Sequence, residues 1–378
     1  MIMRMGAENM SRGIIGMIGS HHSHHANLDM ARPTIIDLAK AAGVSTATVD
    51  RVLNGRSNVR EETVRRVHEA AETIGYHGAN VIRYRLLADK PEFRLGLVLQ
   101  KPRHAFYQDV LRIFEAQARG CMLRRVQIVA RFAETARPEE LAEILLSFKG
   151  RVDAVAATGL DHHLVTQAVQ TLRGNGMPVY ALLSDFAQGV RESYFGTNNL
   201  KVGRIAGWFI SKLARRPGKV GLFVGGPRFH GHELRETGFR SFFRDAAPDF
   251  QLLDTQINLE TRQLTYEATS DLLARHPDLV GLYVAGGGME GAIQAVREAR
   301  SDLSVAPQVV LIVNELTPES QSGLQDQTVS VVLGTPIRQL AADLIGQMIA
   351  TSEKGMAETP GQRFFPSEVW TPESEFMR

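Results

Sequence analysis

The chain has 378 residues, of which 44% are hydrophobic and 22% are charged, and its formal net charge is +2. This length predicts two or three domains, and the composition is that of an ordinary soluble globular protein. No apolar run approaches the roughly 18 residues of a membrane span, and the single cysteine, Cys121, excludes an intramolecular disulfide. We therefore expect a cytoplasmic protein without membrane contact.

Residues 1–30 show no sustained helical or strand period and are predicted to be a flexible extension. The apolar stretch 13–19 is too short for a signal peptide and precedes histidines, which argues against export. These histidines are His21, His22, His24 and His25. We favour a polar tract over a transition-metal site for them. A further hypothesis is that the natural chain starts at Met30, because the first predicted helix begins a few residues later.

Residues 34–54, TIIDLAKAAGVSTATVDRVLN, predict two short helices around a tight turn, the arrangement that places a helix in a DNA major groove. Thr34 can cap the first helix and Ser45 the second, with the break at Gly43. The outer face of the second helix carries side chains suited to base edges and phosphates, namely Thr46, Ala47, Asp50 and Arg51. Taken alone, the pattern fits a small helical hairpin inside another domain equally well.

Residues 60–75 continue as a third amphipathic helix, and three helices can enclose a minimal core. From Ala31 to Lys90 the chain has ten Lys or Arg against seven Asp or Glu, a modest basic excess that suits phosphate binding. We predict a DNA-binding domain over residues 31–78 and a hinge or linker over residues 79–92.

After Pro91, short apolar runs alternate with helical stretches. The predicted strands are 95–99, 126–130, 154–157, 179–183, 220–224, 279–285, 309–313 and 329–333. The helical stretches include 107–120, 138–148, 199–213 and 289–300. Near-continuous apolar strands joined by helices predict parallel sheets covered on both faces, and this number of strands favours two doubly wound α/β lobes over one.

Ligands of doubly wound sheets bind at the carboxyl ends of strands, so a cleft between the two lobes is the expected small-molecule site. The loops there carry a mixture of rings, charges and amides: Lys101, His104, Phe106, Tyr107, Asp185, Phe186, Arg235, Glu236, Asn314, Glu315 and Thr335. Such a mixture suits a polyhydroxylated ligand, because rings stack on its apolar face while forked hydrogen bonds hold its hydroxyls.

Catalytic signatures are weak, since G-x-S-x-G, H-E-x-x-H and P-loop motifs are all missing. Gly286-Gly287-Gly288 lacks the spacing of a dinucleotide loop, and we favour a tight turn that lets a ligand approach closely. His162-His163 is interpreted as a solvated helix start rather than a metal site. We therefore expect no enzymatic activity, no cofactor and no bound metal.

The three-helix module followed by a two-lobed body resembles the LacI/GalR (lactose-repressor) family of bacterial transcription regulators, from Pro33 to about the carboxyl terminus. The motif DLAKAAGVSTATVDRVLNG carries the resemblance, and the segments AGGGMEGAIQAV and VNELTPESQSGL look like the sugar-responsive branch. The resemblance implies an α/β chain with a helix-turn-helix domain and a periplasmic-binding-protein-like (type I) domain. The latter would span residues 93–378 and serve effector binding and dimerisation. A homodimer or homotetramer is implied as well.

By position, the resemblance implies phosphate contacts from Thr34, Ser45, Thr48 and Asn54 and base contacts from Thr46, Ala47 and Arg51. The sequence departs from the family at two places. Asp50 stands where serine is usual and would repel phosphate unless an arginine pairs with it. Arg60 stands where a helix-capping serine is usual.

The hinge sequence ANVIRYRLL lacks the family's usual alanine-rich pattern. Leu86 or Leu87 is the candidate wedge for the minor groove, and Arg83 and Arg85 are candidates to track phosphate or the narrow groove. A plain basic linker is the alternative.

In the body, Arg235 matches an R-x-x-G-F motif whose arginine would grip ligand hydroxyls or a carboxylate, and Glu315 matches an acid for sugar hydroxyls. Asn199 matches a polar cleft residue, Phe106 is a candidate stacking ring, and Gly287 lies in the glycine-rich turn. Residues 334–336 read Gly-Thr-Pro where glutamine and an aromatic are often found, which leaves the ligand open.

The resulting prediction is a ligand-responsive regulator, expected to be a repressor, that binds double-stranded operator DNA and senses a sugar, polyol or sugar acid. The main alternative is a solute-binding protein of a transport system, which would share the two-lobed body but needs an export signal. An enzyme and a metal-responsive regulator using the histidine tract are further alternatives.

Overall fold

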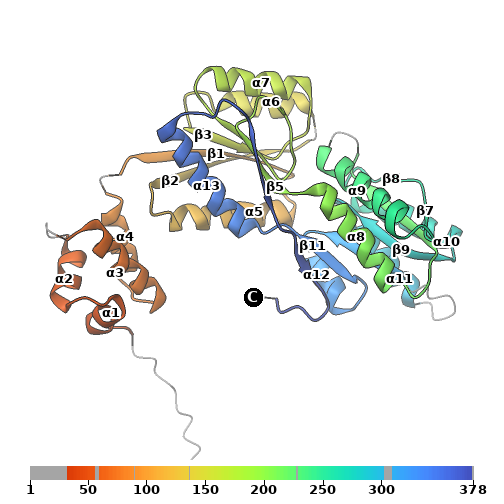
Figure 1. Ribbon diagram of the computed structural model, residues 1–378, viewed down its shortest axis with the longest axis horizontal. Helices are drawn as coiled ribbons and strands as arrows, with labels where there is room; N and C mark the ends of the chain where they lie inside the picture. Colours follow the sequence, from red (N-terminus) through yellow and green to blue (C-terminus); the bar gives the residue numbers. More distant parts are fainter. Residues whose placement is uncertain are drawn as a thin grey trace, which may run out of the picture. The chain divides into compact units, whose positions relative to one another are not determined.

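The computed structural model describes residues 32–55, 59–88, 90–135, 137–226, 229–301 and 309–376. The chain divides into two compact units, Met1–Arg85 and Leu86–Arg378, which Figure 1 shows coloured along the sequence. The histidine tract and Met30 lie outside the described residues, and the domain boundaries expected from the sequence stay predictions.

The first unit contains four helices over its described residues. They are α1 (Ile35–Ala42), α2 (Thr46–Asn54), α3 (Glu61–Thr73) and α4 (Ala79–Leu86). Thr34 and Asp37 form a capping box at α1, and the Ser45 side chain accepts from the Thr48 amide at the start of α2. Gly43 adopts the left-handed conformation with φ of 62° between them, so all three local predictions are confirmed. Arg60 precedes α3 without a capping side-chain bond, as its departure from serine implied.

A small apolar core holds these helices together. Leu38, Val49, Val67 and Ala71 are fully buried, as is Ile82 from α4. The amphipathic character predicted for the third helix is therefore confirmed at Val67 and Ala71, and the fourth helix contributes to the same core.

The second unit has two sheets, with the strand orders β12-β5-β4-β3-β1-β2 and β13-β11-β10-β9-β6-β7. The strands of the first lobe are β1 (Glu92–Gln100), β2 (Arg125–Ala133), β3 (Ala154–Ala157), β4 (Val179–Leu182), β5 (Ser193–Thr197) and β12 (Gly361–Phe365). Those of the second lobe are β6 (Lys219–Val224), β7 (Gln251–Leu252), β8 (Gln256–Ile257), β9 (Leu279–Val284), β10 (Val310–Asn314), β11 (Val331–Gly334) and β13 (Glu368–Trp370). All pairs are parallel except β11 with β13. The predicted two-lobed α/β class is confirmed.

Helices connect the strands in both lobes. They are α5 (Ala105–Gly120), α6 (Pro138–Ser147), α7 (His163–Gly174), α8 (Asn199–Leu213), α9 (His230–Ala246), α10 (Arg262–Arg275), α11 (Met289–Ser301), α12 (Pro318–Gln325) and α13 (Ile337–Lys354). The chain passes from the first lobe to the second after β5, returns for α13 and β12, and leaves again for β13. The two lobes are thus joined by three separate crossings. As predicted, α7 begins at the histidine pair, with the His162 side chain accepting from the Leu164 amide.

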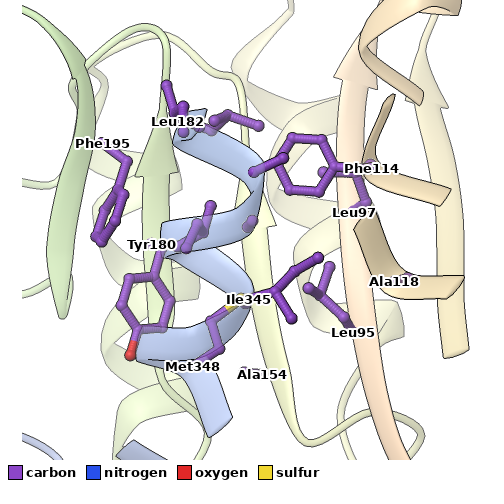
Figure 2. Packing of buried hydrophobic residues seen from close by; sticks show 14 of the residues in the cluster. Leu95, Leu97, Phe114, Ala118, Ala154, Tyr180, Leu182, Phe195, Ile345 and Met348 are labelled. Atoms are coloured by element: carbon purple, nitrogen blue, oxygen red, sulfur yellow. The ribbon is translucent and has the colours of Figure 1, made fainter. Parts of the chain in front are cut away.

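The core of the first lobe depends on the late return of the chain. Figure 2 shows Ile345 and Met348 of α13 beside Leu95, Leu97 and Tyr180 of the sheet. These side chains are at most 2% exposed, and the Tyr180 hydroxyl donates to Thr351 Oγ1 over 2.8 Å. Residues more than 150 positions apart therefore share one buried apolar layer.

In the second lobe, α8 and α9 pack with their backbones in contact. A Cβ atom at Gly203 would lie 1.9 Å from the Arg235 carbonyl oxygen, and one at Gly238 would lie 2.0 Å from the Leu200 carbonyl oxygen. Only glycine permits this approach. Phe239, fully buried, anchors α9 in the core next to Gly238. This packing fixes where Arg235 stands on α9.

Candidate DNA-binding surface and effector cleft

Helix α2 turns one side into the core and one side to solvent. Val49 and Val52 are buried, while Thr46, Ala47 and Arg51 are exposed on the outer side. The predicted base-contacting residues thus share an accessible helix face.

The predicted phosphate contacts differ in their surroundings. Thr34, Ser45 and Asn54 are exposed, and Thr48 is half-buried with its hydroxyl 2.9 Å from the Ser45 hydroxyl. Asn54 donates its amide to Asp50 Oδ1 over 2.7 Å, so the unusual acid is held by a neighbour one turn away. That bond directs the carboxylate along the helix.

The hinge candidates lie in and just after α4. Arg83 is half-buried, and Leu86 is half-buried while Leu87 is only 3% exposed. A buried Leu87 has to be uncovered before it can enter a groove. The Arg85 guanidinium donates to the carbonyl oxygens of Val52 and Leu53 at the end of α2, where the sequence had suggested a phosphate or groove contact.

The main cavity of the second unit lies between the lobes and spans about 800 Å³, including its open mouth. Lobe-one lining residues are Lys101, His104, Phe106, Tyr107, Thr158, Leu183 and Ser184. Lobe-two lining residues are Phe229, Gly231, His232, Arg235, Glu260, Gly286, Gly287, Met289, Asn314, Glu315, Thr317 and Thr335. The predicted Phe106, Arg235, Gly287 and Glu315 are brought together here.

Asn199 is placed differently from the prediction. It is 4% exposed and does not line the main cavity but a smaller one beside it. Its Oδ1 accepts from Arg235 Nε over 2.8 Å, while Arg235 Nη1 donates to the Ala285 carbonyl over 2.6 Å. Asn199 therefore supports the arginine from behind, because α8 begins at this residue and packs directly on α9.

Glu315 stands opposite, at the end of β10, in the left-handed conformation with φ of 69°. Its carboxylate accepts from the Thr335 amide over 3.0 Å and from the Thr335 hydroxyl over 2.8 Å. Burial raises the pKa of Glu315, against the opposing effect of Arg235 and Thr335. Thr335, which follows β11 and departs from the family pattern, thus positions the Glu315 carboxylate.

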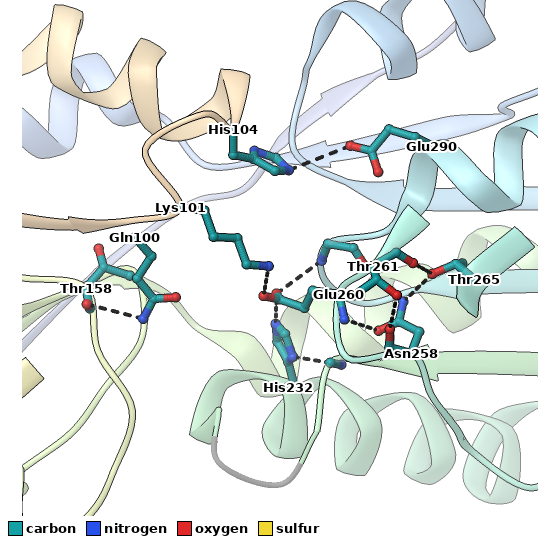
Figure 3. A network of polar contacts seen from close by, with 12 residues as sticks. Gln100, Lys101, His104, Thr158, His232, Asn258, Glu260, Thr261, Thr265 and Glu290 are labelled. Carbon is teal, nitrogen blue, oxygen red and sulfur yellow. Dashed lines mark hydrogen bonds and ion pairs between the residues drawn. The ribbon is translucent and has the colours of Figure 1, made fainter. Parts of the chain in front are cut away.

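Glu260 is the main cleft residue that the sequence did not indicate. It follows the two-residue strand β8, and Figure 3 shows its carboxylate between residues of both lobes. Glu260 Oε2 lies 2.6 Å from Lys101 Nζ, and Oε1 accepts from the Gly287 amide over 3.2 Å. Burial by itself raises the pKa of Glu260, but His232, Lys101 and the Gly287 amide lower it to about 2. The carboxylate is therefore ionised and forms an ion pair across the cleft.

His232 lies beside Glu260, with 3.7 Å between its Nε2 and Glu260 Oε1. Its Nδ1 accepts from the Gly225 amide over 3.2 Å, so the proton of the neutral ring is on Nε2. Burial lowers the pKa of His232 to about 4. At neutral pH this side chain is an uncharged donor at the cavity wall.

Backbone strain gathers around the same cavity. Lys101, Leu183, Glu260 and Glu315 all line it and all have positive φ, between 47° and 69°. Non-glycine residues adopt this conformation at a cost of roughly 1–2 kcal/mol, so their clustering marks a functional site.

Fold and site together define a DNA-binding unit attached to a two-lobed ligand-binding unit. The family described as "Bacterial regulatory proteins, lacI family" matches residues 34–78, and the family described as "Periplasmic binding protein domain" matches residues 95–354. The first unit therefore carries a lacI-family domain and the second a periplasmic-binding-protein domain, and the chain is a DNA-binding transcription regulator.

Two relatives and one solved structure illustrate the likeness. HTH-type transcriptional regulator GntR of Pseudomonas aeruginosa is 24% identical over 84% of this chain and 95% of that protein. Catabolite control protein A of Streptococcus mutans is 29% identical over 51% of this chain, and the match spans about half of that protein, 55%. A solute-binding protein of Burkholderia graminis, solved with D-arabinose, has a TM-score of 0.68 at 17% identity and covers 75% of this chain and 96% of its own.

These relatives are transcription regulators and solute-binding proteins. The likeness to this solute-binding protein covers 75% of the chain, and the lacI match over residues 34–78 favours the regulator over the transport alternative. Over the residues that the structure describes, no helix is long and apolar enough to cross a membrane.

Proposed function

We propose that the chain is a cytoplasmic repressor that binds a near-palindromic operator as a homodimer, or as a homotetramer, and responds to a small polyhydroxylated effector. The observation that carries the proposal is that one chain holds an exposed polar recognition face on α2 and a polar cavity between two lobes. In a dimer, two such helices meet half-sites one helical turn apart.

For the DNA, phosphate contacts fall to Thr34, Ser45, Thr48 and Asn54, and base contacts fall to Thr46, Ala47 and Arg51. The exposure of six of these seven side chains supports the assignment. The hinge contacts are assigned to Arg83 with Leu86 or Leu87, which require a change in the surroundings of Leu87.

For the effector, the charges of the cavity favour an uncharged sugar or polyol over a sugar acid. The described lining has two cationic side chains, Lys101 and Arg235, and two carboxylates, Glu260 and Glu315. Lys101 is already paired with Glu260, and Arg235 acts on Glu315 electrostatically. A charged ligand would upset this balance, whereas hydroxyls can bridge it and Phe106 can stack on a sugar face. The D-arabinose bound by a structural neighbour is in line with this choice.

The test begins with the full-length protein and a randomised DNA library. We expect enrichment of a near-palindromic duplex, and we expect neutral sugars or polyols, but not sugar acids, to raise the thermal unfolding temperature and change the affinity for that duplex. If no DNA sequence is enriched at low salt, the proposal that the protein binds a specific operator is wrong. If only sugar acids act, the effector assignment is wrong.

The effector site is tested by Arg235→Gln. A lost charge-assisted hydrogen bond is worth about 1.5–3 kcal/mol, so the effector that stabilises the wild type is expected to bind roughly 10- to 100-fold more weakly, while basal operator affinity stays unchanged. Arg244→Gln, on an exposed arginine of the same helix, is the matched control and is expected to behave as wild type. Equal effector affinity in both variants would contradict the assignment.

Sedimentation velocity tests the assembly. We expect a dimer or tetramer at micromolar concentration, since a single short recognition helix reads only one half-site. A monomer that still binds the enriched duplex tightly would overturn this part.

A further inference from the structure

Arg85 occupies the end of the recognition helix and not its outer face. Its Nη1 donates to the Val52 carbonyl over 3.3 Å and to the Leu53 carbonyl as well. A Cβ atom at Gly55, the residue that ends α2, would lie 3.2 Å from the same nitrogen. The guanidinium therefore covers the carboxyl end of α2.

Arg85 belongs to a stripe of α4 that faces α2 and the core. Gly78, the residue just before α4, lies four positions before Ile82 and seven before Arg85, a spacing that places all three on one side of a helix. Ile82 is fully buried, and a Cβ atom at Gly78 would come within 3.2 Å of the Leu53 side chain. The backbone just before α4 and the Arg85 side chain near its end thus both lie next to Leu53. On the other side of α4, Val81 and Tyr84 are 48% and 71% exposed.

The carbonyl end of α2 needs such a partner. The helix has nine residues, and helices this short have little stability of their own. Its last carbonyls have no partner within the helix, and Gly55 satisfies only those of Arg51 and Val52. A cation at this end also interacts favourably with the helix dipole. Arg51 and Asn54, assigned above to DNA, lie in the turn that Arg85 closes.

We propose that Arg85 is a positioning residue for operator recognition: by capping α2 from the hinge helix, it orders the last recognition turn and couples α4 to α2. The inference rests on the proposed DNA contacts of α2. It assigns Arg85 no contact with DNA, in contrast to the phosphate or groove contact that its charge and place in the hinge suggested.

The experiment compares full-length wild type with Arg85→Ala, Arg85→Lys and Arg66→Ala. Arg66, an exposed arginine of α3, is the control for loss of one positive charge from the same unit. The probe is the duplex enriched by the wild type, with a scrambled duplex of equal length for non-specific binding. Affinity is measured over a salt series, and amide hydrogen exchange is followed without DNA.

For Arg85→Ala we expect about five- to tenfold weaker binding to the enriched duplex, little change for the scrambled duplex, and an unchanged slope of log affinity against log salt. Amides in the last turn of α2 should exchange faster, while those of α1 and α3 stay protected. Arg85→Lys should recover part of both effects, because an ammonium can reach one carbonyl.

A direct phosphate contact would instead lower the salt slope by about 0.9, and that result overturns the proposal. Two exchange results for Arg85→Ala also overturn it. If the α2 amides exchange as in the wild type, no cap was lost. If the amides of all helices exchange faster to the same extent, the whole unit was destabilised. If the wild type enriches no duplex, the operator proposal fails, and the exchange measurement still decides whether Arg85 orders α2.

Discussion

His232 and Glu260 are neighbours in the cleft wall, and each is held in one protonation state by different contacts. Glu260 stays ionised because Lys101 and the Gly287 amide face it. His232 stays neutral because it is buried and because its Nδ1 is occupied by the Gly225 amide. Acid therefore affects the two residues in separate ranges of pH, and the histidine responds first.

The pH dependence of stability tests this arrangement. Burial lowers the pKa of His232 from 6.5 to about 4, so between these values the unfolded chain binds a proton that the folded chain does not. The free energy of unfolding must then fall as the pH falls from 6.5 to 4, by about 3 kcal/mol from this residue. His232→Gln should lose this part of the pH dependence. Glu260 contributes stability above pH 4.5 that is lost as the pH falls towards 2.

Urea unfolding followed by tryptophan fluorescence is the measurement, since both tryptophans, Trp208 and Trp370, lie in the second unit. His163→Gln alters an exposed histidine of the same unit and should keep the wild-type curve. If the stability of His232→Gln also follows the wild-type curve between pH 4 and 6.5, the inference that His232 is buried and neutral is wrong.

At the scale of elements, the sequence predicted every strand with a continuous apolar run. All eight predicted strands lie in the sheets. The missed strands are β5, β7, β8, β12 and β13. They are short or carry exposed and polar residues; β12, for example, reads GQRFF and only its last residue is buried. Three of them, β7, β12 and β13, lie at sheet edges, where pairing with a neighbouring strand makes a segment a strand without a local apolar pattern.

The cleft residues also divide into those that local sequence patterns predicted and those that they did not. Arg235 and Glu315 were predictable because they follow long strands and stand in motifs of the family. Glu260 was not, since it follows a two-residue strand and adopts a positive φ that its residue type disfavours. Asn199 was predicted as a cleft residue, but the close packing of α8 on α9 turns it towards Arg235.

That packing leads to a prediction about Gly238. A methyl group there would meet the Leu200 backbone at 2.0 Å, so Gly238→Ala must separate α8 from α9. We expect a loss of about 2–4 kcal/mol in the free energy of unfolding, together with weakened effector binding because Arg235 moves. Urea unfolding and the thermal-shift response report the two effects.

Gly346→Ala is the matched control, because it changes a glycine inside α13 whose added methyl group would meet nothing within 4 Å. It should raise stability by about 0.5–1 kcal/mol. Similar effects of the two substitutions would contradict the role of close helix packing.

At the scale of the whole second unit, two contacts join the lobes across the cavity from one loop. Lys101 pairs with Glu260 at 2.6 Å, and His104 Nε2 lies 3.7 Å from Glu290 Oε1, as Figure 3 shows. Both first-lobe residues follow β1, and both acids belong to the second lobe. Because both contacts span the cavity, they favour a closed arrangement of the lobes over an open one.

Removing both contacts should therefore open the cleft. Pairs of this kind are worth up to roughly 1 kcal/mol, and the one at His104 is an ion pair only while its ring is protonated, so Lys101→Gln combined with Glu290→Gln is expected to shift the closed-to-open ratio about fivefold or more. Spin labels at positions 146 and 264, on exposed leucines of α6 and α10, report the distance between the lobes in a Cys121→Ser background. The distance distribution should lengthen and broaden, and the effector should bind more weakly by the same factor because it must then supply the closing free energy.

Arg124→Gln is the control. It breaks an ion pair inside the first lobe, to Glu353, and should leave the distribution unchanged. A double variant whose distances match this control would mean that packing at the crossings, and not the two contacts, holds the lobes together.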